Sequence, residues 1–214
     1  MNKIGILGSG QVAQALGNGF LKHNYKVMLS SRDISKLSSW KDKGGERAHT
    51  GSFEEAAKFG RIIVLAVKGK EAANIIEMAG PQYLHGKTVI DVTNPIADAP
   101  QEDGVIKFFT NLDESLMERL QAQFPEVHFV KAFSCVGNAF MVNPPFKEQP
   151  TMFICGNNDS SKKEVHHILE QFGWDIADMG KATGARAIEP LCMLWCIPGI
   201  LNGQWNHAFR LIKA

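Results

Sequence analysis

Residues 3–17 read KIGILGSGQVAQALG, an apolar run followed by a glycine-containing turn and by small residues at helical spacing. The order strand, turn, helix predicts the first unit of a dinucleotide-binding α/β fold. In such a turn Gly8 permits the tight bend, Gly10 lets the backbone approach a pyrophosphate, and Ala13 keeps the helix close to the strand. The free N–H groups and the positive dipole end of the helix would then face the phosphates.

The end of the second predicted strand lacks the acidic residue that such folds place about 20 residues after the turn. Residues 27–36 read VMLSSRDISK, so Ser30, Ser31 and Arg32 stand at this point. An acid there accepts hydrogen bonds from the adenosine ribose and would repel a 2′-phosphate, whereas hydroxyls and a guanidinium would bind it. Lys36 adds a second cation one helical turn after Arg32. The sequence therefore predicts NADP as the cofactor.

Apolar strands and helices alternate through the rest of the chain. Continuous apolar runs such as RIIVLAV (61–67) are typical of parallel strands that are covered on both faces. We expect strands at 2–8, 26–30, 47–49, 61–67, 88–95, 128–133, 151–156 and 174–180. Helices are expected at 10–23, from Ser52, at 70–79, at 115–124 with Asp113 as a cap, from Ser161, and from Thr183 to the end with interruptions at Pro190 and Pro198. This order predicts a Rossmann-like, doubly wound, mostly parallel α/β sheet over residues 1–180 and a C-terminal helical segment over residues 181–214 that packs on it.

The composition limits the classes of partner that we expect. Of the 214 residues, 44% are apolar and 21% are charged, and the net charge is +1, so no broad electric field would attract nucleic acid or an anionic membrane. The first strand begins by Lys3, which leaves no room for a signal peptide, and the apolar stretch 190–201 is short for a membrane span. We therefore expect a cytoplasmic protein with no nucleic-acid or membrane partner. The four cysteines form no CxxC pair, and no metal site is expected.

Several short motifs occur in an order that is found in one group of oxidoreductases. They are GILGSGQVAQAL (5–16), SSR (30–32), RIIVLAV (61–67), DVTNP (91–95), VKAF (130–133), ICG (154–156) and ADMG (177–180). Together they resemble the deazaflavin (coenzyme F420)-dependent NADP oxidoreductase family and are similar to the cytosolic reductase domain of the six-transmembrane metalloreductases. The resemblance implies an enzyme that binds NADP along the sheet edge and transfers hydride between the nicotinamide and a flavin or deazaflavin ring.

The same resemblance implies which residues hold the cofactor, beside Gly8, whose role follows from the turn. Contacts to the phosphates and the ribose are implied for Ser9, Gly10, Gln11, Val12, Ser31, Arg32 and Lys36. Ala66, Val67 and Lys68 would lie by the adenosine, and Asn94, Pro95 and Ala132 would lie near the nicotinamide.

Two departures from the family pattern concern the electron acceptor. Lys68 and Gly69 stand where deazaflavin-dependent members have a Pro–aromatic pair, and VKAFSCVGN (130–138) is closer to the metalloreductase pattern.

Hydride transfer between two stacked rings needs orientation and exclusion of water rather than an acid–base pair. A dehydrogenase or imine reductase of a small organic substrate would need a proton donor, for which Lys131 is the best candidate. For Lys131 itself, a structural lysine bonded to loop carbonyls is the favoured interpretation. A non-catalytic NADP-sensing module is a third alternative for the protein.

The C-terminal stretch is rich in large apolar residues, among them Trp195, Trp205 and Phe209. Such a stretch is typical of a core or of an interface between subunits. Related enzymes pair through a helix of this kind, so we expect a homodimer whose second substrate is a small-molecule electron acceptor.

Overall fold

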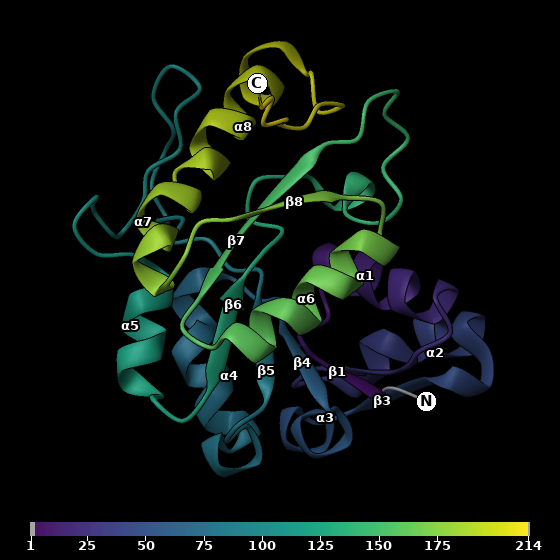
Figure 1. Cartoon of the computed structure of the whole chain (residues 1–214). Helices are drawn as coiled ribbons and strands as arrows, with labels where there is room; N and C mark the ends of the chain where they lie inside the picture. The colour runs from purple at the N-terminus through teal and green to yellow at the C-terminus, as the bar shows by residue number, and fades with distance from the viewer. Residues whose placement is uncertain (1–2, 214) are drawn as a thin grey trace.

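The computed structural model describes residues 3–213 and contains an eight-stranded sheet in the order β3-β2-β1-β4-β5-β6-β7-β8 (Figure 1). The strands are β1 (Lys3–Leu7), β2 (Lys26–Ser30), β3 (Ala48–Gly51), β4 (Ile62–Leu65), β5 (Thr88–Asp91), β6 (His128–Lys131), β7 (Thr151–Gly156) and β8 (Asp175–Asp178). Strands β1 to β6 are parallel, β7 is antiparallel to β6, and β8 is parallel to β7. The first six strands have the order of a doubly wound nucleotide-binding sheet, which confirms the predicted fold class.

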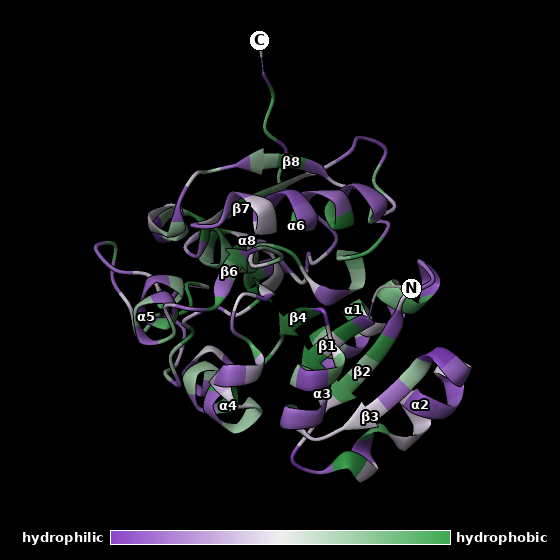
Figure 2. Ribbon diagram, turned by 60° about the horizontal axis from the view of Figure 1, so that its bottom comes forward, coloured by the Kyte–Doolittle hydropathy of each residue, from purple (hydrophilic) through white to green (hydrophobic). Residues whose placement is uncertain are grey.

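Helices cover both faces of the sheet. One face packs against α1 (Gln11–Lys22), α2 (Ser38–Gly44) and α6 (Asp159–Gln171), and the other against α3 (Phe53–Phe59), α4 (Ala72–Ala79), α5 (Leu116–Gln123) and α7 (Ala185–Ile188). Side chains alternate between the two faces along a strand. Ile4 and Ile6 of β1 therefore pack in the core on the side of α1, α2 and α6, and Leu7 packs in the core on the side of α3, α4, α5 and α7. Figure 2 shows hydrophobic strands between helices whose outer surfaces are hydrophilic.

Two helices begin at residues other than those predicted. Ser115, and not Asp113, caps α5, because its hydroxyl accepts from the Glu118 N–H at 3.1 Å while the Glu118 carboxylate accepts from the Ser115 N–H at 2.9 Å. Asn158, and not Ser161, caps α6, because its side-chain oxygen accepts from the Ser161 N–H at 2.9 Å. Each cap satisfies an N–H group that the helix itself cannot bond.

The C-terminal helix is shorter than predicted. Helix α8 (Leu191–Asn202) ends at Gly203, whose φ of +67° is left-handed, and residues 203–213, here called the C-terminal strap, are not helical. Pro198 lies inside α8 without ending it, whereas Pro190 precedes its first residue. The predicted interruption at Pro198 and the predicted helix beyond Asn202 are therefore wrong.

The apolar stretch 190–201 is part of a longer helical run. Counted from the turn before α7, the run Ala182–Asn202 has 21 residues and meets the length and composition of a membrane span, and 33% of the 18-residue window that does so is buried. The core helix of a soluble protein passes the same test. Cys192 and Trp195 of α8 are buried against the rest of the chain.

Strand β7 begins beyond the carboxyl end of β6 and extends past the parallel part of the sheet (Figure 1). There the C-terminal strap lies beside it: the Thr151 N–H donates to the Phe209 carbonyl oxygen at 2.9 Å, and the Leu211 N–H donates to Thr151 Oγ1 at 3.0 Å. The residue pairs that join β6 to β7 are Val130–Gly156 and Lys131–Cys155. The overhanging part of β7, the strap and α8 thus stand beside the carboxyl edge of the sheet.

Candidate functional site

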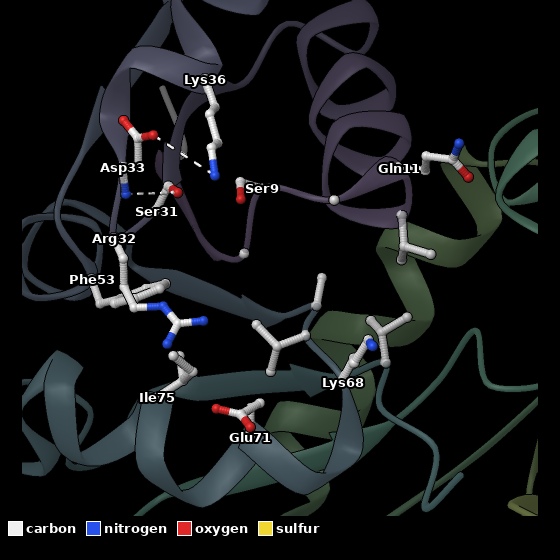
Figure 3. A pocket seen from close by; sticks show the side chains of 16 residues that line it. Ser9, Gln11, Ser31, Arg32, Asp33, Lys36, Phe53, Lys68, Glu71 and Ile75 are labelled. Carbon is white, nitrogen blue, oxygen red and sulfur yellow. Dashed lines mark hydrogen bonds and ion pairs between the residues drawn. The ribbon is translucent and has the colours of Figure 1, made fainter. Parts of the chain in front are cut away.

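A cavity of about 610 Å³ lies at the carboxyl ends of β1, β2 and β4, where a doubly wound sheet binds its ligand (Figure 3). Its lining includes the predicted residues Gly8, Ser9, Gly10, Gln11, Val12, Ser31, Arg32, Lys36, Ala66, Val67 and Lys68. The structure adds Asp33, Phe53, Glu71, Ile75 and Val92, which sequence reasoning did not select. The residues predicted for the phosphates and the adenosine are therefore brought together in one place.

The glycine turn forms the part of the cavity beside α1. Gly8 has φ +144°, and a Cβ atom there would lie 2.2 Å from the Ala66 carbonyl oxygen, so glycine is required. A Cβ atom on Gly10 would meet no described atom within 4 Å, so this position opens onto free space. Gly10 is also the N-cap of α1, and no side chain within residues 3–213 caps this helix. The first N–H groups of α1 are thus available to an anion, and the turn fits a pyrophosphate.

The residues that follow β2 form another wall of the cavity and include two cations, Arg32 and Lys36. Ser31 Oγ accepts from the Asp33 N–H at 3.1 Å, which leaves the hydroxyl hydrogen of Ser31 free to donate to a ligand. The Asp33 carboxylate accepts from the N–H and the hydroxyl of Ser35 at 3.1 and 2.6 Å and lies 3.7 Å from Lys36 Nζ. The hydrogen bond from the Ser35 hydroxyl holds the pKa of Asp33 below its usual value. The acid at this wall is therefore bonded locally, while Arg32 extends into the cavity (Figure 3).

The opposite wall is largely apolar. Phe53 and Ile75 line it together with Glu71, and in Figure 3 the Arg32 guanidinium points across the cavity toward Ile75 and Glu71. A planar guanidinium facing apolar side chains is suited to hold a flat aromatic ring such as adenine. Ser30, expected beside Ser31 as a second donor, is instead buried and donates to the Ile6 carbonyl oxygen at 2.7 Å.

The residues predicted for the nicotinamide lie past the end of this cavity at Val92. Asn94, Pro95 and Ala132 are outside its lining, and Ala132 is fully buried. Asn94 Nδ2 donates to the Ser134 carbonyl oxygen at 2.8 Å. Asn94 Oδ1 and Ser134 Oγ are shielded from solvent and have no hydrogen-bond partner in the described part of the chain. Unpaired buried oxygens are uncommon, and here they mark a place for a polar group of a ligand or for water.

Lys131 is fully buried, and its ammonium group donates to the Thr93 carbonyl oxygen at 2.9 Å. It also forms ion pairs with Asp91 Oδ2 at 2.7 Å and Glu189 Oε1 at 2.9 Å. Burial alone would lower the pKa of Lys131, but the two carboxylates more than offset this and hold the pKa above its usual value. A fully buried lysine between two carboxylates keeps its proton and is shielded from a substrate, so the geometry supports the structural interpretation of Lys131.

Comparison with known proteins agrees with this geometry. The family model described as coenzyme F420-dependent NADP oxidoreductase matches residues 3–95. Over these residues the chain is similar to that family. The match confirms the resemblance drawn from the motifs.

Similar proteins cover most of the chain. The F420-dependent NADP reductase of Methanocaldococcus jannaschii is 27% identical over 90% of this chain and 90% of its own length. A crystal structure from Arthrobacter sp. FB24, provisionally assigned as an F420-dependent NADP-reductase, superposes with a TM-score of 0.92 at 25% identity and covers 100% of both chains. Metalloreductase STEAP3 of Rattus norvegicus is 27% identical over 93% of this chain. The chain spans 39% of that metalloreductase, less than half of its length.

Proposed function

We propose that this chain is a reductase that transfers a hydride between NADP(H) and a flavin or deazaflavin ring. The observation that carries the proposal is the cavity itself, in which an uncapped helix N-terminus adjoins Arg32 and Lys36. A helix N-terminus suits the pyrophosphate of a dinucleotide. Two cations and a free hydroxyl where an acid usually stands suit a 2′-phosphate.

The residues of the cavity would hold successive parts of the cofactor. The first N–H groups of α1 would donate to the pyrophosphate, and Ser31 and Arg32 would donate to the 2′-phosphate. Phe53 and Ile75 would contact the adenine ring. When bound, NADPH supplies a hydride from its nicotinamide ring. The chain would direct that ring past Val92, toward the polar atoms of Asn94 and Ser134.

A ring acceptor is supported by the state of Lys131. Reduction of a carbonyl or an imine needs a positioned proton donor. Lys131 is fully buried between two carboxylates, and it is not among the residues that line the cavity. A flavin or deazaflavin exchanges its remaining proton with water, so the protein has to orient the two rings and exclude water from the contact. The name of the methanogen relative, F420-dependent NADP reductase, supports the deazaflavin as the first candidate.

The proposal is tested by incubating the flavin-free protein with NADPH and one acceptor at a time. The acceptors are F420, FMN, FAD, a ferric chelate, a quinone, and a set of carbonyl and imine compounds. We expect loss of NADPH absorbance with F420 or a flavin, and no loss with a Gly10→Val variant. Turnover of a carbonyl or imine without flavin would replace the proposal with a dehydrogenase or imine reductase. Tight NADPH binding without turnover of any acceptor would replace it with a sensing module.

We also propose that the protein acts in the cytoplasm as a homodimer and without a nucleic-acid or membrane partner. The net charge of +1 supports the absence of a broad attraction to polyanions. The exposed apolar side chains of α8 support pairing of two copies. Fractionation of cells that express the full chain tests the location, because a membrane-bound protein would sediment with the membranes.

A further inference from the structure

A buried ionic cluster of Asp91, Lys131 and Glu189 lies behind the loop that follows β5. All three side chains are shielded from solvent. Asp91 Oδ1 accepts from the Thr93 N–H at 2.9 Å and from Thr93 Oγ1 at 2.6 Å, and the Thr93 carbonyl oxygen accepts from Lys131 Nζ at 2.9 Å. The cluster therefore fixes both polar backbone groups of the residue that lies between Val92, at the end of the cavity, and Asn94.

Glu189 connects this cluster to two further elements. It lies between α7 and α8, and its carboxylate accepts from the N–H groups of Leu116 at 2.9 Å and Met117 at 3.0 Å. These N–H groups are at the start of α5, where the positive end of the helix dipole stabilises a carboxylate. The same carboxylate lies 2.9 Å from Lys131 Nζ. One side chain thus joins the C-terminal helices, α5 and the end of β6.

Helix α8 also touches the loop that follows β6. A Cβ atom on Gly137 would lie 2.7 Å from the Trp195 ring, so the indole already fills the space beside this glycine. The same loop contains Ser134, whose carbonyl oxygen accepts from Asn94 Nδ2 at 2.8 Å. The position of α8 is therefore set by Glu189, just before its first turn, and by the contact of Trp195 with Gly137.

We infer that Glu189 is a positioning residue for hydride transfer, which sets the distance between the C-terminal helices and the loop of residues 92–95. This inference rests on the proposed function, because it assumes that the nicotinamide lies at that loop, which Thr93 and Lys131 connect to Glu189. A buried carboxylate that accepts two N–H hydrogen bonds and pairs with a lysine allows little freedom of position, unlike a purely apolar contact. A misplacement of about 1 Å at a reacting centre can slow a reaction about 100-fold.

The test compares Glu189→Gln with Glu118→Gln. Glu118 is a matched control, because its carboxylate also accepts N–H bonds at the start of α5 but does not touch Lys131. We expect single-turnover hydride transfer from NADPH to F420 or FMN to slow about 10- to 100-fold in Glu189→Gln. The dissociation constant of NADPH should stay unchanged, because the adenosine half of the cavity is intact. Glu118→Gln should leave both quantities as they are.

A second variant keeps the inference testable if Glu189→Gln does not fold. Gly137 has φ −72°, so alanine is compatible with its backbone, and Gly137→Ala would displace Trp195 without removing a charge. It should show the same slow transfer with unchanged NADPH affinity. Wild-type transfer rates in Glu189→Gln or in Gly137→Ala would overturn the inference, and so would a parallel loss of rate and affinity in folded protein.

A second readout separates this inference from the proposed function. If the unmodified protein reduces no ring acceptor, the proposed function fails, but the fluorescence of bound NADPH still reports on its nicotinamide. We expect Glu189→Gln to change that emission at saturating NADPH, whereas Glu118→Gln should not. Identical emission from all three proteins would overturn the positioning role.

Discussion

Arg32 extends from the end of β2 into the cavity, where it is placed to bind a 2′-phosphate. Loss of a charge-assisted contact costs about 1.5–3 kcal/mol, so Arg32→Ala should weaken NADPH binding about 10- to 150-fold. NADH binding should barely change, because NADH has no phosphate at this position. Titration calorimetry with both cofactors measures the effect, and Arg47→Ala, outside the cavity, is the control. Equal affinity of the unmodified protein for NADPH and NADH would contradict the assignment of this wall.

The two glycines of the turn should respond to substitution in different ways. Gly10 opens onto free space, so Gly10→Val should keep the fold, with a cost of about 1 kcal/mol at the helix start, and abolish binding of both cofactors. Gly8 has φ +144° and the Ala66 carbonyl oxygen beside it, so Gly8→Val should lower the melting temperature markedly. Thermal melts followed by NADPH titration distinguish the two. Normal NADPH binding by Gly10→Val would show that the dinucleotide lies elsewhere.

Some residues of this site could be predicted from the sequence, and others could not. Gly8, Gly10 and Arg32 stand directly after strands, so a motif and the rule on carboxyl edges select them. Phe53 and Ile75 reach the cavity from α3 and α4, and their place depends on how those helices cross the sheet. No motif marks such residues. The acidic partners of Lys131, Asp91 and Glu189, lie far from it in the sequence, so no motif marks its structural role either.

At the level of single elements, the start of α5 is stabilised by an acid whose charge can be titrated. Glu118 completes the capping box with Ser115 and also accepts from the Arg186 guanidinium at 2.8 Å. The hydrogen bond from Arg186 lowers the pKa of Glu118 from 4.5 to about 2. A lowered pKa in the folded state means that the stabilisation is complete above pH 4.5 and is lost as the pH falls from 4.5 toward 2.

The Glu118→Gln variant tests this element. Near neutral pH it should be less stable than the unmodified protein by about 0.5–2 kcal/mol, because the cap is weakened. The difference in unfolding free energy between the two proteins should decrease as the pH is lowered from 4.5 toward 2, the usual and the folded-state pKa of Glu118. Urea unfolding at a series of pH values measures it. Glu55→Gln, in the capping box of α3, has no arginine partner among the described residues and should give a smaller gap. A difference in unfolding free energy that stays constant down to pH 2 would contradict the pairing of Glu118 with Arg186.

The type of each element could be predicted, but several ends could not. Before α5, Asn111 Oδ1 accepts from the N–H groups of Asp113 and Glu114 at 2.8 and 3.1 Å, so the chain forms a separate turn there. Asp113 is held in that turn, and the helix starts at the next residue able to cap it, Ser115. Both residues are good caps by type, and the choice between them depends on a hydrogen bond made outside the helix.

At the scale of the whole molecule, α8 leaves large apolar side chains in contact with solvent. Leu194 is 54% exposed and Leu201 is 57% exposed. If two copies pair through this helix, as we propose, Leu194→Glu should convert a dimer to a monomer, because the interface would bury an unpaired charge. Light scattering or sedimentation measures the mass. Met78→Glu on α4, where the side chain is 45% exposed, is the control. A monomeric unmodified protein at micromolar concentration would contradict the proposal.

The overall class of the sheet could be predicted, while the reversal of its last strands could not. Alternation of strands and helices indicates a doubly wound sheet whichever way the final strands point. The run TMFICG (151–156) is largely apolar, and such a run has the same pattern in a parallel and in an antiparallel strand. The direction of β7 is decided by the loop before it and by the C-terminal strap, whose contacts with Thr151 join distant parts of the chain.

The connection between β6 and β7 is short, so we expect the sheet to separate there first under tension. Two residue pairs cross it, whereas five pairs join β1 to β2 and four join β5 to β6. Under a force applied to the two chain ends in an optical trap, the piece that contains β7, β8 and the strap should detach first. The remaining parallel strands would then yield in a second, larger step. Tension would therefore remove the wall beside the carboxyl edge while the glycine turn and its cavity stay folded.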